Sequence, residues 1–152
     1  MDDSVDVDGE AVAGMVEACR PDWTIETFER SGYGTDLVCV LTYGTPSGRR
    51  EAVLKATTAD LVPPEIARSE PRLLELVGRE TPVPVPDVYG YVDAHEEYPA
   101  PFYLMEYVRG ENFQGRPEAL PAAARDRVVT EDRKSTRLNS SHEIPSRMPS
   151  SA

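Results

Sequence analysis

The residue whose type and position most suggest chemistry is Lys55. Lys55 and Lys134 are the only lysines in the chain, which otherwise uses arginine for its permanent positive charges. Lys55 lies in a segment, residues 52–56, that reads Ala-Val-Leu-Lys-Ala and is typical of a strand. A single ammonium in an arginine-using chain suggests a position that needs a compact point charge. The alternative is an ordinary strand residue that faces solvent.

A second candidate feature is the pair of glycines Gly32 and Gly34, in a Ser-Gly-Tyr-Gly-Thr-Asp turn over residues 31–36. The backbone N–H groups of such a turn could bind a phosphate. Hairpins use glycines routinely, however, so the pattern by itself is weak evidence for a phosphate site.

These residues need a sheet to position them, and the sequence predicts one. Alternating and β-branched residues predict strands at residues 23–29, 37–43, 51–57, 88–92 and 102–108, the first three joined by tight turns. An amphipathic helix is predicted from Asp8, which can cap it, to Arg20. A second helix is predicted between Pro64 and Gly78. The order of helix, three strands, helix and two strands predicts an α+β fold around a five-stranded antiparallel sheet, with a helix packed on it.

The second helix contains a proline, Pro71, beyond the first turn where proline is tolerated. We therefore expect a new helical start near Ser69, with a break or kink that separates it from residues 65–68. Gly78 suits the position just after the end of this helix.

Four segments resemble, in their order and spacing, the aminoglycoside phosphotransferase family. They are Val53-Leu54-Lys55, then Glu70-Pro-Arg-Leu-Leu-Glu-Leu, then Pro84-Val-Pro-Asp-Val-Tyr-Gly, then Phe102-Tyr-Leu-Met-Glu-Tyr-Val-Arg-Gly. The resemblance covers about residues 25–129. That family shares the protein-kinase fold and includes kinases of antibiotics, choline, homoserine and other small metabolites.

The sequence pattern and the resemblance together predict a division of the chain into four parts, of which the last is residues 132–152. Residues 1–21 would form an N-terminal helix, and residues 22–116 a protein-kinase-like N-terminal lobe that binds the nucleotide. Residues 117–131 would begin a linker helix to a C-terminal lobe that this sequence lacks.

The resemblance also implies roles for the residues around Lys55. Lys55 would contact the α- and β-phosphates of ATP, and Glu70 would pair with it and fix its direction. Glu65 is the alternative partner, because the proline after Glu70 makes the local helix unusual. Gly32 and Gly34 would lie in the loop that covers the phosphates, although the full three-glycine pattern is absent.

The segment Met-Glu-Tyr-Val at residues 105–108 resembles the hinge that holds the adenine ring in this family. The backbone carbonyl of Glu106 and the N–H of Val108 would bind the adenine edge. A buried core strand over residues 102–108 is the simpler interpretation, and both can hold together.

The family's catalytic machinery has no counterpart in this sequence. It uses an aspartate in a His-Gly-Asp-x-x-x-x-Asn run to orient the acceptor hydroxyl, and a second aspartate to hold Mg²⁺. Neither His95 nor His142 precedes such a pattern. We therefore predict no catalytic and no metal-binding residues in this chain, and assign ATP and Mg²⁺ to a full-length parent. The sequence as it stands is expected to be truncated before the catalytic lobe and inactive.

The character of the sequence changes after Glu131. Residues 132–152 are rich in serine and basic, without apolar periodicity. They are expected to be a disordered tail, which resembles a translated sequencing adapter; a natural disordered tail is the alternative.

Composition limits the partners. The net charge of −11 would repel nucleic acid and anionic membranes, and such an acidic, lysine-poor chain resembles proteins of salt-loving organisms. No apolar run is long enough to span a bilayer, and no signal peptide is evident, so we expect a cytoplasmic location. The cysteines Cys19 and Cys39 show no metal-ligand spacing and are expected to be small packed residues.

Three functions remain open from the sequence. The first is an ATP-dependent phosphotransferase of a small-molecule acceptor. The second is a non-catalytic half-kinase module that binds nucleotide or regulates a partner. The third is a purely structural interaction domain.

Overall fold

A computed structural model of the chain describes residues 7–31, 36–57, 62–96, 98–110, 118 and 120–140, the last nine of these as backbone only. The chain divides into two units, residues 1–109 and 110–152, which we describe separately. Among the described helices, none is long and apolar enough to cross a membrane.

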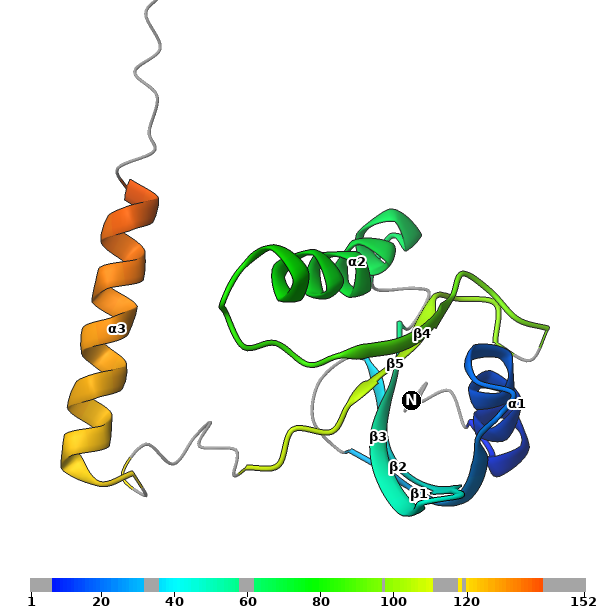
Figure 1. Ribbon diagram of the computed structural model, residues 1–152. Coiled ribbons are helices and arrows are strands. Elements are labelled where there is room, and N and C mark those ends of the chain that lie inside the picture. Colours follow the sequence, from blue (N-terminus) through cyan, green and yellow to red (C-terminus); the bar gives the residue numbers. More distant parts are fainter. Residues whose placement is uncertain are drawn as a thin grey trace, which may run out of the picture. The chain divides into compact units, whose positions relative to one another are not determined.

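The first unit is an α+β arrangement around one sheet (Figure 1). Its elements are α1 (Gly9–Cys19), β1 (Thr24–Arg30), β2 (Leu37–Thr45), β3 (Gly48–Ala56), α2 (Pro64–Glu80), β4 (Val88–Val92) and β5 (Phe102–Glu106). The strands form a five-stranded sheet in the order β1-β2-β3-β5-β4, and every neighbouring pair is antiparallel. The predicted fold class, a five-stranded antiparallel sheet with helices, is confirmed.

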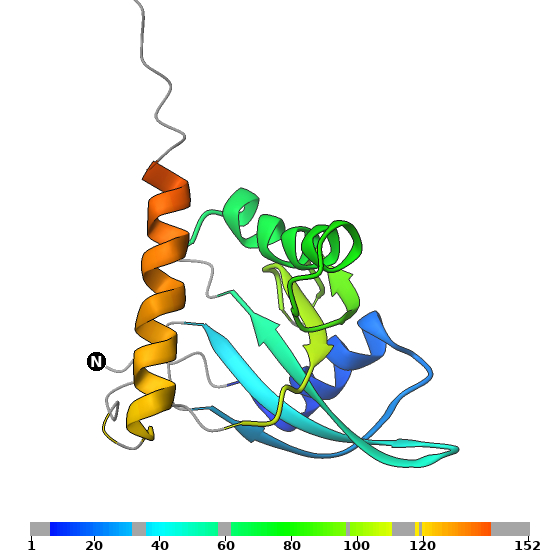
Figure 2. The same cartoon turned by 60° about the vertical axis from the view of Figure 1, so that its left-hand side comes forward.

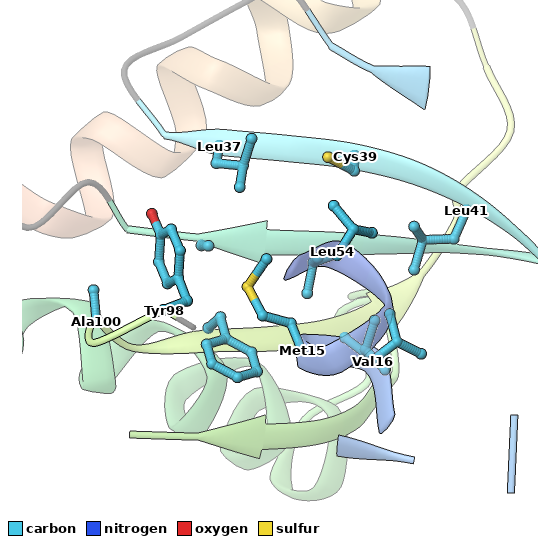
Figure 3. Close-up of a cluster of buried hydrophobic side chains, with 12 residues drawn as sticks. Met15, Val16, Leu37, Cys39, Leu41, Leu54, Tyr98 and Ala100 are labelled. Atoms are coloured by element: carbon cyan, nitrogen blue, oxygen red, sulfur yellow. The ribbon is translucent and has the colours of Figure 1, made fainter. Parts of the chain in front are cut away.

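Helix α1 supplies the apolar core on one face of the sheet. Asp8 caps it as predicted, because its side chain accepts a hydrogen bond of 2.9 Å from the N–H of Ala11. The core residues are Val12, Met15, Val16, Leu37, Cys39, Leu41, Leu54, Ala56, Tyr98, Ala100, Phe102 and Leu104. Figure 3 shows Met15 and Val16 pointing from α1 toward strand residues such as Leu54. Residues of the predicted N-terminal helix thus contribute to the core of the first unit.

The end of α1 approaches the sheet closely at Gly90 of β4. A β-carbon on Gly90 would lie 3.0 Å from both the Cβ and the carbonyl oxygen of Cys19. Only a glycine lets the two backbones come this close without a shift of the helix. Burial raises the pKa of the Cys19 thiol to about 12, so it packs as a neutral group. Both cysteines are unpaired thiols, as predicted.

Helix α2 lies on the other side of β4 and β5 from α1 (Figure 1, Figure 2). It is continuous from Pro64 to Glu80, so the predicted break near Ser69 is wrong. Pro71 is among the most fully buried side chains, and the packing of its ring offsets the hydrogen bond that it cannot donate.

The predicted end of α2 at Gly78 is also too early. The helix passes through Gly78 and ends at Thr81, whose N–H and hydroxyl both donate to the carbonyl of Val77. A β-carbon on Gly78 would lie 3.2 Å from Val85, so this glycine makes room for the returning chain instead of ending the helix.

The second unit contains helix α3 (Ala122–Ser140). It begins after Pro121, whose carbonyl accepts from the N–H groups of Ala124 and Arg125. The helix continues through residues 132–140, where the sequence predicts the start of a disordered tail. No glycine or proline interrupts this stretch, so nothing in the backbone chemistry ends the helix at residue 131.

Candidate functional site

The face of the sheet opposite α1 carries the polar chemistry. Residues paired directly across antiparallel strands point to the same side. The pairing therefore aligns two rows, one of Val38, Lys55, Tyr103 and Tyr91 and the next of Val40, Val53, Met105 and Val88. We call these eight residues the Lys55 face.

The ammonium of Lys55 is held by two carboxylates. Its Nζ lies 2.7 Å and 2.8 Å from the two carboxylate oxygens of Glu70 and 3.3 Å from Oδ2 of Asp36. Lys55 is 21% exposed and Asp36 25% exposed, so the group is partly shielded from solvent. Burial lowers the pKa of Lys55, but the hydrogen bonds and charges of Glu70 and then Asp36 raise it by more, and the net shift is upward. The ammonium is thus fixed in position and firmly charged.

Helix α2 delivers Glu70 to this position. Its buried side is formed by Ala67 and Pro71, which are four residues apart and pack toward the rest of the lobe. Glu70 shares that side, three residues after Ala67. Glu65 is exposed and lines a different groove on α2, together with Arg68 and Leu73. The alternative left open by the sequence is therefore resolved: Lys55 pairs with Glu70 and not with Glu65.

Asp36 was not singled out from the sequence. It directly precedes β2 and stands two residues before Val38, so the alternation of a strand already places it on the same side as Lys55. That spacing is the available signal. It is a weak one, because aspartate is also common in turns without a further role.

Tyr103 was not predicted as a site residue either. It is 4% exposed and is paired directly with Lys55 across β3 and β5. Burial, followed by the charge and close approach of the Glu70 carboxylate and then the charge of Asp36, raises the pKa of its hydroxyl well above the usual range. Within the described part of the chain, that hydroxyl makes no hydrogen bond of ordinary geometry, although the Glu70 carboxylate is close to it. A buried hydroxyl without such a bond beside an ion pair is unusual in a folded protein.

The predicted hinge residues lie at the far end of β5. The N–H of Glu106 donates to the carbonyl of Asp87 at 2.8 Å, which fixes the end of the strand. The strand ends there, and Val108 is 63% exposed. In the described residues no acceptor is found for the N–H of Val108.

A shallow groove of about 480 Å³ adjoins this end of the sheet. It is lined by Thr42, Arg49, Arg50, Glu51, Tyr89, Glu106, Tyr107 and Arg109. Two of its arginines are already neutralised, because Arg49 pairs with Glu26 and Arg109 pairs with Glu51. The groove therefore has less free positive charge than its arginine content suggests.

The structure brings some of the predicted site residues together and leaves others apart. Lys55 and Glu70 are in contact, and Glu106 follows three residues after Tyr103 on the same strand. Gly32 and Gly34 lie outside the described residues.

The Lys55 face combines a fixed cation with an adjacent apolar row. Val53 is buried, and Val40 and Met105 are half-buried. Such a surface suits a ligand that has a flat apolar ring and an anionic group, with the exposed end of β5 offering backbone donors and acceptors.

Comparison with known proteins identifies one matching family. The sequence model of the phosphotransferase enzyme family matches residues 29–131, from the end of β1 into α3. No curated protein matches the chain significantly.

Proposed function

The chain belongs to the phosphotransferase enzyme family, and on that basis we propose that its sheet binds ATP for transfer of a phosphoryl group to a small hydroxylated or amino acceptor. The observation that carries the proposal is the ion pair between Lys55 and Glu70 beside the apolar row of the Lys55 face. A lysine so held is a fixed positive charge, and fixed charges aimed at phosphates are the main contribution that a protein makes to phosphoryl transfer.

The adenine ring is proposed to lie on the apolar row of the Lys55 face. Val40, Val53 and Met105 present flat, half-shielded hydrocarbon beside the end of β5. The carbonyl of Glu106 and the N–H of Val108, for which the described residues offer no acceptor, would then hold the adenine edge, as the family resemblance implies. Gly32 and Gly34 would supply backbone donors to the phosphates.

Mg²⁺ would reach this lobe with the nucleotide and would supply neutralisation of the phosphate charge. Among the described residues, no group of three or more acidic, histidine or cysteine side chains could hold a metal ion. We therefore assign Mg²⁺ no ligand set in this lobe and derive no step through it.

The residues that orient and deprotonate the acceptor are proposed to come from a part of the enzyme that this sequence does not contain, since it has no His-Gly-Asp run. The 152-residue chain by itself is then a nucleotide-binding lobe without transfer activity. The second candidate function, a half-kinase module that binds nucleotide without catalysis, is favoured by the same absence.

The proposal is tested by calorimetric titration of the 152-residue chain with ATP and ADP in the presence of Mg²⁺. We expect Lys55→Met to weaken binding at least about tenfold, since a charge-assisted contact to phosphate contributes roughly 1.5–3 kcal/mol. Lys134→Met is the matched control, because it removes the only other lysine, and it should bind as the wild type does. Equal binding by Lys55→Met and the wild type, or no binding by either, would exclude the proposed role of this face.

A further inference from the structure

Two carboxylates, those of Glu70 and Asp36, contact the ammonium of Lys55 before any ligand binds. A lysine ammonium carries three N–H groups. In the structure its nitrogen faces three acceptor oxygens at hydrogen-bonding or ion-pair distance, two from Glu70 and one from Asp36. The two Glu70 oxygens belong to one carboxylate and share one side of the ammonium, so a phosphate oxygen that approaches from the side of Asp36 must displace the Asp36 contact.

Of the contacts made by the ammonium of Lys55, the one to Asp36 is the weakest and the easiest to displace. Its distance of 3.3 Å is longer than the 2.7 Å and 2.8 Å of the two contacts to Glu70. Glu70 also approaches with both oxygens, and charge-assisted contacts of this kind are the stronger ones. Displacing Asp36 leaves the Lys55–Glu70 pair intact.

The net charge of the cluster also favours displacement of Asp36 by a phosphate. One ammonium lies between two carboxylates, so the cluster of Lys55, Glu70 and Asp36 is negative as a whole. An approaching phosphate meets the carboxylate of Asp36 within a few ångströms of its target, in a partly shielded place where screening by water is reduced.

The fold does not depend on the contact to Asp36. Pairs that keep this much solvent contact contribute little to stability. Lys55 is already fixed by Glu70, and Asp36 lies before the first residue of β2, outside the sheet. Loss of the contact between Asp36 and Lys55 should therefore change the affinity of Lys55 for an anionic ligand more than it changes the stability of the folded chain.

We propose that Asp36 competes with the nucleotide phosphate for Lys55. When no nucleotide is present, the carboxylate of Asp36 contacts the ammonium of Lys55. When a phosphate binds, it displaces the carboxylate of Asp36 from that position. This inference rests on the proposed function, because it specifies how that same site admits its ligand. A consequence is that the site discriminates against free nucleotide anions and in favour of nucleotide whose charge is compensated by a divalent cation.

The first test is titration of the 152-residue chain with ADP in a buffer that contains EDTA and no divalent cation. We expect Asp36→Asn and Asp36→Ala to bind ADP about three- to tenfold more tightly than the wild type, because a like charge near the phosphate is removed. The gain should shrink when Mg²⁺ is added. Asp22→Asn is the matched control, since it removes a carboxylate that pairs with Arg20 instead, and it should leave the affinity unchanged.

The outcomes separate failure of this inference from failure of the proposed function. If the wild type binds ADP and the Asp36 variants bind it equally or more weakly, Asp36 does not compete and the inference is wrong. Weaker binding only in the presence of Mg²⁺ would also overturn it, since Asp36 would then be a metal ligand. If neither the wild type nor any variant binds nucleotide, the proposed function fails as well.

The second test needs no nucleotide. An amine-reactive acylating reagent modifies neutral lysine, so an ammonium held between carboxylates reacts slowly. Peptide mapping can follow Lys55 against Lys134 within one molecule, because they are the only lysines. We expect Asp36→Asn to speed modification of Lys55 several-fold relative to Lys134. An unchanged ratio would show that Asp36 does not hold Lys55 in solution and would overturn the inference.

Discussion

The two faces of the sheet are formed by the same strands but differ in character: the α1 face carries the apolar core, and the Lys55 face carries charged and polar groups. On the α1 face, Leu54 and Phe102 are fully buried in an apolar cluster. On the Lys55 face, the neighbouring residues Lys55 and Tyr103 place an ammonium and a buried hydroxyl beside the carboxylates of Glu70 and Asp36. No charged side chain is buried in the described part of the chain, so the charges of the Lys55 face stay at its surface. Strand alternation thus separates the residues that stabilise the lobe from those available to a ligand.

The α1 face should be the more sensitive of the two to truncation. Phe102 is 0% exposed, and Phe102→Ala is expected to lower the free energy of unfolding by about 3–5 kcal/mol, since it removes a buried ring and leaves a cavity. Urea unfolding followed by circular dichroism measures the change. Phe28→Ala is the control, because Phe28 is 36% exposed and its loss should be much smaller. Similar losses in both variants would contradict the assignment of the core to this face.

The Lys55 face should contribute a smaller, pH-dependent stabilisation. Lys55→Met is expected to lower the free energy of unfolding by about 1 kcal/mol at pH 7, as partly exposed ion pairs do. The pKa of Lys55 is raised in the folded protein, where the attraction of Glu70 and Asp36 outweighs burial. Its contribution is therefore fully present below the ordinary lysine pKa of about 10.4, and is lost as the pH rises through the higher folded value.

Urea unfolding of the wild type and of Lys55→Met at pH 7 and pH 11 checks this sign. The difference between the two proteins should be smaller at pH 11. Lys134→Met, measured in parallel, is the control, because it removes the only other lysine and shows how far the loss of a lysine outside the Lys55 face changes the free energy of unfolding. A difference that stays constant or grows with pH would mean that the pair with Glu70 does not set the charge of Lys55.

Much of the α1 face could be predicted from the sequence, because it depends on local patterns. The periodicity of Val12, Met15 and Val16 and the cap at Asp8 predict α1, and alternation predicts the strands. The break predicted at Pro71 failed for a tertiary reason. A buried ring can offset a lost helical hydrogen bond, and the sequence alone does not show that Pro71 is buried.

The Lys55 face was predictable only in part, because its chemistry depends on residues far apart in the chain. The family resemblance implies the pair of Lys55 and Glu70, but it does not decide against Glu65. The proximity of Asp36 and Tyr103 to Lys55 follows from the register of three strands, which must be known before their side chains can be brought together.

Two buried tyrosines, Tyr98 on the α1 face and Tyr103 on the Lys55 face, allow the contribution of a single hydroxyl to stability to be compared between the faces. Tyr98 in the α1 core donates its hydroxyl to the carbonyl of Thr57 at 2.9 Å, whereas the hydroxyl of Tyr103 makes no hydrogen bond of ordinary geometry among the described residues. Tyr98→Phe should therefore lower the free energy of unfolding by about 1 kcal/mol, because the carbonyl loses its donor. Tyr103→Phe should change it by less than about 0.5 kcal/mol, or raise it slightly, because it removes a desolvated hydroxyl without breaking a hydrogen bond of ordinary geometry. Urea unfolding of both variants at pH 7 measures the two changes in the free energy of unfolding.

A loss for Tyr103→Phe as large as that for Tyr98→Phe would show that the Tyr103 hydroxyl donates a hydrogen bond to Glu70 in solution. Tyr103 would then help to position the carboxylate that holds Lys55.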